Sequence, residues 1–143
     1  MATFGLESKR ELATVHPSLI QIADMAITIM DFKVIQGGRS LEESIINVAR
    51  GVSRLKDPSK SKHIVQPDGY AHAFDLAPYG LKGVDWQDTE MFCVLAGVIL
   101  ACAHILGVKI RWGGDWDSDG STRDEKFRDY GHFELIFPLT EVV

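Results

Sequence analysis

The sequence has 143 residues, of which 45% are hydrophobic and 24% are charged. These values are ordinary for a globular protein, and the length suits one domain with its own hydrophobic core. The formal net charge of −5 gives no electrostatic reason to expect nucleic acid or an anionic membrane surface as a partner, because both attract basic proteins. We therefore expect residues 1–143 to form a single domain.

The two cysteines, Cys93 and Cys102, lie nine residues apart in one apolar run. On a helix they would be about 13 Å apart along the axis, on opposite sides, so they cannot form a disulfide. We expect both to be reduced core residues, as in a reducing cytosol. The N-terminus has no basic segment followed by an apolar one, so no signal peptide is predicted. The apolar run at residues 91–106 is predicted to be too short to span a membrane.

The first half of the chain is predicted to contain two helices and a short strand. Residues 1–15 show little periodicity. From Pro17 to residue 30, apolar residues recur at steps of three and four, which indicates an amphipathic helix with proline in its first turn. Residues 32–35 alternate like a strand, and the Gly-Gly pair at 37–38 is predicted to turn the chain. Ser40 begins a capping box, which predicts a helix through about residue 49.

The second half is predicted to contain three strands and the longest helix. Residues 73–78 resemble a buried strand, and residues 79–87 a connecting loop. Residues 88–106 have a wide apolar face typical of a core helix, which Gly107 ends. Strands are predicted at 108–112 and 132–137, separated by an acidic loop. This mixture of helices and antiparallel strands predicts the α+β class.

Histidines and carboxylates gather in two stretches of the sequence. The first contains His63 and Asp75, and the second contains Asp129 and His132. Two imidazoles and a carboxylate, with another carboxylate to transfer protons, are the groups that a catalytic zinc site needs. Asp75 lies in an otherwise apolar run, and burying a carboxylate is costly unless it is paired or binds a metal. The alternative is that Asp75 caps a turn and His132 only packs at the start of a strand.

The other histidines are weaker candidates. His72 competes with His63 for the role of first ligand, because it lies just before the Asp75 strand. His104 is expected to be a core histidine of the long helix. His16 is expected to be a surface or capping residue before the first helix.

These stretches resemble the LAS group of zinc peptidases, which includes VanY-like D-Ala-D-Ala carboxypeptidases and phage L-alanyl-D-glutamate endolysins. The family pattern is Ser-x-His-x-x-Gly-x-Ala-x-Asp, followed later by Glu or Asp, two residues, His and an aromatic residue. Residues 61–63 (Ser-Lys-His), 73–75 (Ala-Phe-Asp) and 129–133 (Asp-Tyr-Gly-His-Phe) match it. Residues 36–40 resemble the family's Gly-Arg-Ser turn, and residues 108–116 resemble the Trp-Gly-Gly-Asp-Trp turn of the phage branch.

One part of the sequence departs from that pattern. The family usually has six residues between the first histidine and the aspartate, whereas 11 separate His63 from Asp75. We interpret residues 64–70 as containing an inserted loop that turns at Pro67-Asp68-Gly69. The insertion leaves both His63 and His72 open as the ligand, and the Ser-x-His context favours His63.

The resemblance implies a small Hedgehog/DD-peptidase-like fold, with a short antiparallel sheet packed by helices. It also implies a zinc site with one position open to water, held by His63, Asp75 and His132. Asp129 would be the general base. Arg39 would brace the substrate carbonyl or its developing oxyanion, and Ser61 would orient a ligand or bind substrate.

The function implied is that of a phage-type endolysin, a catalytic domain alone, which cuts peptidoglycan stem peptides between L-Ala and D-Glu. Such an enzyme would be a monomer that accumulates in the host cytoplasm and reaches the wall after the membrane is permeabilised. It would neither bind nucleic acid nor insert into a membrane. The alternatives are a D-Ala-D-Ala carboxypeptidase and a non-catalytic, metal-bound wall-binding module.

The acidic loop has the spacing of the start of a calcium-binding loop. Asp115, Asp117 and Asp119 occupy positions one, three and five, and Gly120 occupies position six. Position twelve is Lys126 instead of glutamate, so a full EF-hand is not predicted. A calcium site that assists activity and a solvated acidic loop both remain open, the solvated loop being the commoner case.

Overall fold

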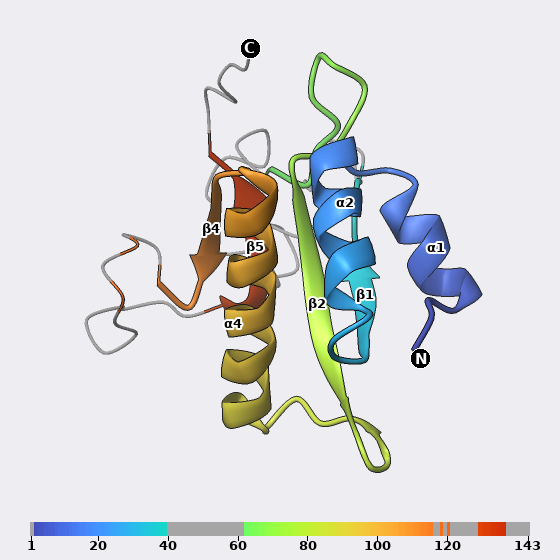
Figure 1. Cartoon of the computed structure of the whole chain (residues 1–143). Coiled ribbons are helices and arrows are strands. Elements are labelled where there is room, and N and C mark those ends of the chain that lie inside the picture. The colour runs from blue at the N-terminus through green and yellow to red at the C-terminus, as the bar shows by residue number, and fades with distance from the viewer. Residues whose placement is uncertain (1, 40–61, 116–117, 119, 121–128, 137–143) are drawn as a thin grey trace, which may run out of the picture.

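Helices pack against one face of an antiparallel sheet in the computed structural model, which describes residues 2–39, 62–115, 118, 120 and 129–136 (Figure 1). This arrangement confirms the predicted α+β class. The helix predicted from Ser40 lies outside the described residues.

The sheet is built from segments far apart in the sequence. Its strands lie in the order β1 (Phe32–Gln36), β2 (Ala73–Gly80), β5 (Asp129–Leu135) and β4 (Ile110–Gly113), and each neighbouring pair is antiparallel. A short strand, β3 (Gly83–Val84), pairs with the end of β2 and makes a hairpin. The sequence predicted only a connecting loop there, since two residues are too few to show alternation.

The alternation of side chains gives the sheet two chemically different faces. Phe74 and Leu76 of β2 and Phe133 of β5 are fully buried on the face that packs against the helices. Asp75 and His132 therefore point to the opposite face. These two residues are direct cross-strand partners in the β2–β5 register, so pairing the strands brings their side chains together.

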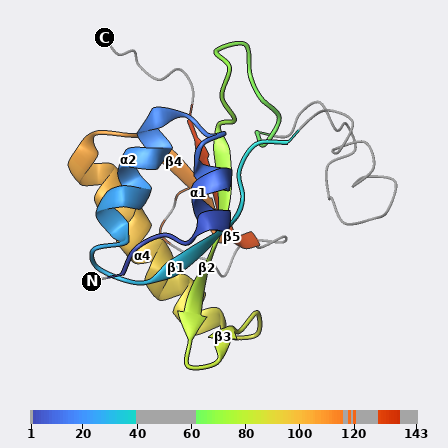
Figure 2. The ribbon, with the colours of Figure 1, turned by 90° about the vertical axis from the view of Figure 1, so that its right-hand side faces the viewer.

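Two helices cover the core face of the sheet. Helices α2 (Pro17–Ala26) and α4 (Thr89–Leu106) lie side by side in both views (Figures 1 and 2). The ring of His16 accepts the Ser18 N–H at the start of α2, which confirms its predicted capping role. Asp88 caps α4 in the same way.

The sequence did not predict the first helix, α1 (Leu6–Leu12). It is short and largely exposed, so its apolar pattern is weak. It lies against β1, where the buried Ser8 hydroxyl accepts the Val34 N–H at 3.0 Å. Gly37 and Gly38 follow β1 without forming the predicted turn. Gly37 must lack a side chain, because a Cβ there would overlap the Glu11 carbonyl oxygen of α1 and the Thr14 hydroxyl.

Helix α4 differs from its prediction in two respects. His104 is exposed, although we expected it in the core, and the neighbouring Ile105 is exposed as well. By length and composition alone, α4 could cross a membrane, with 18 residues and a mean hydropathy of 2.0. The prediction that this apolar run is too short to span a membrane was therefore wrong. Here it packs as a core helix, with a third of its residues buried. Cys93 and Cys102 are free, as expected.

Candidate metal centre

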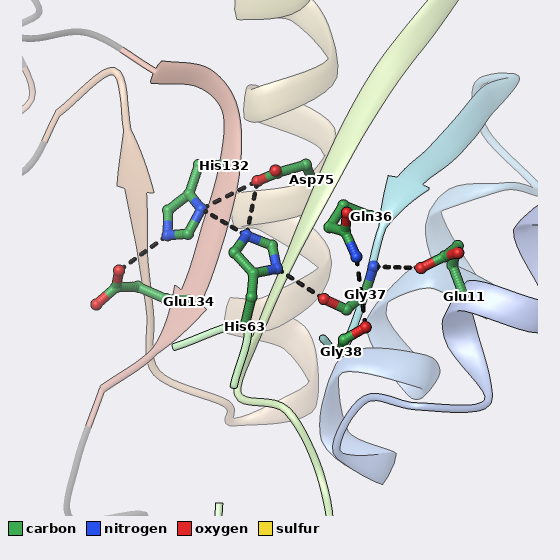
Figure 3. A network of polar contacts seen from close by, with 8 residues as sticks. All are labelled: Glu11, Gln36, Gly37, Gly38, His63, Asp75, His132 and Glu134. Carbon is green, nitrogen blue, oxygen red and sulfur yellow. Dashed lines mark hydrogen bonds and ion pairs between the residues drawn. The ribbon is translucent and has the colours of Figure 1, made fainter. Parts of the chain in front are cut away.

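Three side chains converge on the open face of the sheet. His63 Nε2 lies 3.2 Å from Asp75 Oδ1, His132 Nδ1 lies 3.0 Å from the same oxygen, and the two ring nitrogens are 3.3 Å apart (Figure 3). All three donor atoms lie within 4.8 Å of one another. Both histidines are buried and Asp75 is half-buried. One atom from each of three residues could therefore bind one ion.

Backbone contacts fix the position of each of these residues. Asp75 and His132 face each other through the strand register. The segment carrying His63 is held on both sides, because the His63 carbonyl accepts the Arg39 N–H at 2.8 Å and the Lys62 carbonyl accepts the His72 N–H at 2.9 Å. The cluster thus depends on strand pairing and on this clamped segment.

Glycine at position 131 is required by close strand packing. A Cβ there would lie 2.6 Å from the carbonyl oxygen of Leu76 on the neighbouring strand. Gly131 therefore lets β5 approach β2 closely between Asp129 and His132.

The second nitrogen of His63 is also engaged. Its Nδ1 lies 2.8 Å from the Gly37 carbonyl, which can only accept, so Nδ1 carries the proton and Nε2 is left to bind a metal. Gly37 is fixed in turn, because its N–H donates to Glu11 Oε1 at 2.8 Å (Figure 3). Through Gly37, Glu11 of helix α1 thus helps to hold His63 in place.

His132 is oriented by a carboxylate. Its Nε2 lies 2.9 Å from Glu134 Oε1, and Arg111 Nη2 donates to Glu134 Oε2 at 2.7 Å. Glu134 fixes the tautomer that leaves Nδ1 facing Asp75, an arrangement common among metal-binding histidines. Sequence reasoning missed the bond from Arg111 to Glu134. The signal available was alternation, because His132 and Glu134 share one face of a strand.

The carboxylates of Asp75 and Glu134 stabilise a positive charge between them, on His132 or on a bound cation. Burial lowers the pKa of His132, but its hydrogen bonds to Asp75 and Glu134 outweigh burial and raise that pKa to about 9. Burial raises the pKa of Asp75, and the imidazoles of His63 and His132 more than reverse this, so it stays well below the usual value. Similarly, His132 and Arg111 overcome burial and lower the pKa of Glu134 to about 2. A cation bound here would replace the proton on His132.

Asp129 lies beside the cluster in a cleft of about 210 Å³. Asp75, Trp86 and Tyr130 also line this cleft. Burial raises the pKa of Asp129, and the nearby charge of Asp75 raises it further, while the two histidines oppose the shift. A carboxylate with a raised pKa, next to a cluster that can bind metal, suits a role in proton transfer.

His72 belongs to a different group of residues. Its buried ring points at Asp68, with Nε2 2.7 Å from Oδ2, and stacks edge-on against His16. Asp68 sits in the inserted loop, which turns as predicted: the Gln66 carbonyl accepts the Gly69 N–H, and Gly69 has a φ of 89°. Of the two competing histidines, the structure brings only His63 to Asp75 and His132.

The remaining site predictions are only partly covered by the described residues. Arg39 is held next to His63 through its backbone. Asp115 belongs to the Trp-Gly-Gly-Asp-Trp segment, where its N–H donates to the Trp112 carbonyl at 3.0 Å. Its carboxylate accepts the Gly120 N–H at 2.9 Å. Ser61, Asp117 and Asp119 lie outside the described residues.

Two histidines and an aspartate that meet on one face of an antiparallel sheet, with another carboxylate in the adjoining cleft, define a catalytic domain of the metallohydrolase type. A family model for phage L-alanyl-D-glutamate peptidases matches residues 1–136, and the chain belongs to this family. The L-alanyl-D-glutamate peptidase of Escherichia phage T5 is 41% identical over 138 residues, covering 93% of this chain and 97% of that protein.

A solved structure supports the same assignment. The crystal structure of the L-Ala D-Glu endopeptidase ChiX of Serratia marcescens superimposes with a TM-score of 0.73 at 26% identity, covering 94% of this chain and 90% of ChiX. The resemblance and the fold inferred from sequence motifs are therefore confirmed.

Proposed function

We propose that this chain is a phage-type endolysin, a metal-dependent endopeptidase that cleaves the L-Ala–D-Glu bond in the stem peptides of bacterial peptidoglycan. The observation that carries the proposal is the convergence of His63, Asp75 and His132 within 4.8 Å. Family membership supports the substrate, because the relatives from phage T5 and Serratia marcescens are named for this bond.

The metal proposed is Zn²⁺, held by His63 Nε2, His132 Nδ1 and Asp75. Two imidazole nitrogens and one carboxylate are a donor set typical of catalytic zinc. The hydrogen bonds to Gly37 and Glu134 support this assignment, because each occupies the nitrogen that would not bind the metal. When bound, zinc would polarise the peptide carbonyl and lower the pKa of water in the site.

The chain's own residues would handle the protons and orient the substrate. Asp129 is proposed as the general base, which takes a proton from the attacking water and passes it to the leaving amine. Arg39 is proposed to donate hydrogen bonds to the scissile carbonyl as negative charge develops on its oxygen. Ser61 is proposed to orient a ligand or the substrate.

The test is lysis of bacteria whose outer membrane has been permeabilised, comparing the wild type with His132→Ala and with the surface variant Leu6→Ala. The fall in turbidity should require His132, and mass spectrometry should find new D-Glu amino termini on the released peptides. Release of terminal D-Ala alone would instead indicate a carboxypeptidase. Zinc binding without any cleavage would indicate a non-catalytic module.

The site of action follows from the substrate. We propose synthesis in the host cytoplasm and action on the wall after the membrane has been permeabilised, with the chain working as a monomer. Sedimentation at micromolar concentration tests the monomer, and fractionation of infected cells before and after lysis tests the location.

Calcium binding by Asp115, Asp117 and Asp119 stays a prediction. If it is correct, calcium would bind the acidic loop that precedes Asp129 in the sequence and would raise activity. Unchanged activity in a chelator selective for calcium over zinc would contradict it.

A further inference from the structure

The cleft beside the metal centre is too small for the whole substrate. Its volume of about 210 Å³ is below the range of about 300–1,000 Å³ usual for pockets that enclose a drug-sized ligand. In peptidoglycan, the glycan strand lies on one side of the bond that is cut, and the rest of the stem peptide lies on the other. The substrate must therefore extend from the cleft onto the neighbouring surface.

One such surface continues directly from the cleft. The β2–β3 hairpin and the loop leading to α4 enclose a second hollow of about 1,080 Å³. Trp86 lines both this hollow and the cleft. The hairpin projects from the end of the sheet, close to the start of α4 (Figure 2). A ligand in the cleft could thus extend past Trp86 to the hairpin.

This second hollow is rich in exposed aromatic and apolar side chains. Trp86 is 60% exposed, Tyr79 is 40% exposed and Leu81 is fully exposed. The Trp86 ring packs against the ring of Phe92, with centroids 5.9 Å apart, which holds it in place while leaving much of it accessible. Aromatic rings of this kind offer an apolar face beside a polar edge, which suits the mixed apolar and hydroxylated surface of a sugar.

The charges on the two sides of the metal centre differ. The hairpin hollow has one lysine, Lys82, against Asp85 and Asp88, so its side chains sum to −1. On the other side, Arg39 and Lys62 adjoin His63 in the backbone. Strand β1 pairs with β2 so that Gln36 lies opposite Asp75, and Arg39 follows Gln36 on the side away from the hairpin.

The two sides of the scissile bond in peptidoglycan also differ in charge. The L-Ala nitrogen is joined directly to the lactyl group of N-acetylmuramic acid, so an uncharged sugar ring lies one residue before the scissile bond. The D-Glu side carries free carboxylates. An acidic peptide would be repelled by the hairpin hollow and attracted to the side of Arg39 and Lys62.

Building on the proposed function, we propose that Tyr79, Leu81 and Trp86 form a subsite for the glycan strand of peptidoglycan. The N-acetylated sugars next to L-Ala lie on this hairpin surface, and the acidic peptide leaves the cleft on the opposite side. The hairpin thus distinguishes peptide attached to glycan from free peptide, and its binding energy favours cleavage within the intact wall.

Binding tests the subsite without relying on cleavage. The metal-loaded, ¹⁵N-labelled chain is titrated with a peptide-free glycan of alternating N-acetylglucosamine and N-acetylmuramic acid, and separately with the free tripeptide L-Ala-D-Glu-diaminopimelate. The glycan should shift the Trp86 indole N–H signal, assigned from Trp86→Phe, and the Tyr79 amide. Glycan shifts confined to other residues, or no shifts, would overturn the subsite.

Kinetics test its contribution to specificity. For each protein, kcat/KM is measured on the disaccharide-tripeptide and on the free tripeptide. Tyr79→Ala should lower the ratio of the two values by about tenfold, equivalent to about 1.4 kcal/mol. Tyr70→Ala is the matched control, because Tyr70 is 37% exposed and lies in the loop of residues 64–70 that precedes β2, whereas the hairpin is at the other end of that strand. It should keep the wild-type ratio.

The outcomes separate the two proposals. A wild-type ratio in Tyr79→Ala would overturn the subsite while leaving the endopeptidase intact. Cleavage of neither substrate would overturn the proposed function, and the glycan titration would still decide the subsite. Shifts at Trp86 and Tyr79 caused by the tripeptide instead of the glycan would reverse the proposed polarity and overturn the subsite.

Discussion

Replacing Glu134 with glutamine would remove one negative charge from the outer side of His132 while keeping an oxygen that can accept its Nε2 proton. Glu134 is buried and lies 2.9 Å from His132, so little water screens this charge. Arg111, which bonds to Glu134, has 42% of its side chain exposed, and water can solvate its guanidinium. We therefore expect the fold to survive and the metal centre to change.

Two effects of this substitution on metal affinity oppose each other. Loss of the carboxylate makes the imidazole a weaker ligand, and losing such a supporting group typically lowers metal affinity about 10–100-fold. It also lowers the pKa of His132, which Glu134 helps to raise to about 9, so a proton competes less with the metal near neutral pH. The full loss should appear only above that pKa.

The assay is zinc affinity by competition with a chelator, at about pH 7 and about pH 9.5. Glu134→Gln should bind zinc about 10–100-fold more weakly than the wild type at the higher pH, with a smaller gap at the lower pH. Glu7→Gln is the matched control, because Glu7 pairs with Lys33 at 3.0 Å on the exposed surface. Equal affinities of Glu134→Gln and the wild type at the higher pH would refute the supporting role of Glu134.

Three further predictions follow from the same geometry. Asp129→Asn should keep its zinc by elemental analysis while kcat falls about 10²–10⁴-fold, and loss of zinc in parallel would contradict its role as a base. In the metal-free chain, the pKa of His132 is raised from 6.5 to about 9, so its stabilisation is complete below pH 6.5 and is lost as pH rises through 9. Urea unfolding should show up to about 3 kcal/mol of this loss, and a flat profile would exclude it. Gly131→Ala should destabilise the fold by about 1–3 kcal/mol in urea, because the added Cβ meets the Leu76 carbonyl at 2.6 Å. Its control, Gly97→Ala, has open space on an exposed helix face and should instead stabilise by about 0.5–1 kcal/mol.

The sequence by itself determined the features that depend on neighbouring residues. Helix α4 was predicted almost to the residue, because Asp88 caps it and Gly107 ends it with a φ of 73°. Strand β2 was predicted from its apolar run, and Asp75 was noticed because a carboxylate in such a run needs a partner. These signals are local: they depend on side-chain periodicity and on capping hydrogen bonds within a few residues.

The sequence could not provide the groups that support the cluster. Helix α1 was missed because it is short, and with it the contact of Glu11 with Gly37 that fixes His63. The bond from Arg111 to Glu134 was missed because it joins β4 to β5 across the sheet. Both depend on contacts between segments distant in the chain, which no local pattern records.

Only the tertiary structure decided which histidine joins the cluster. His63 and His72 have the same chemistry, and the inserted loop made the family spacing ambiguous. In the fold, the Gly37 carbonyl aims the His63 ring at Asp75, while Asp68 holds the His72 ring elsewhere. His132 meets Asp75 because the strand register sets them opposite each other, and a slip of one residue would turn one of them to the core face. The residues supply the ligand atoms, but long-range packing determines which atoms meet.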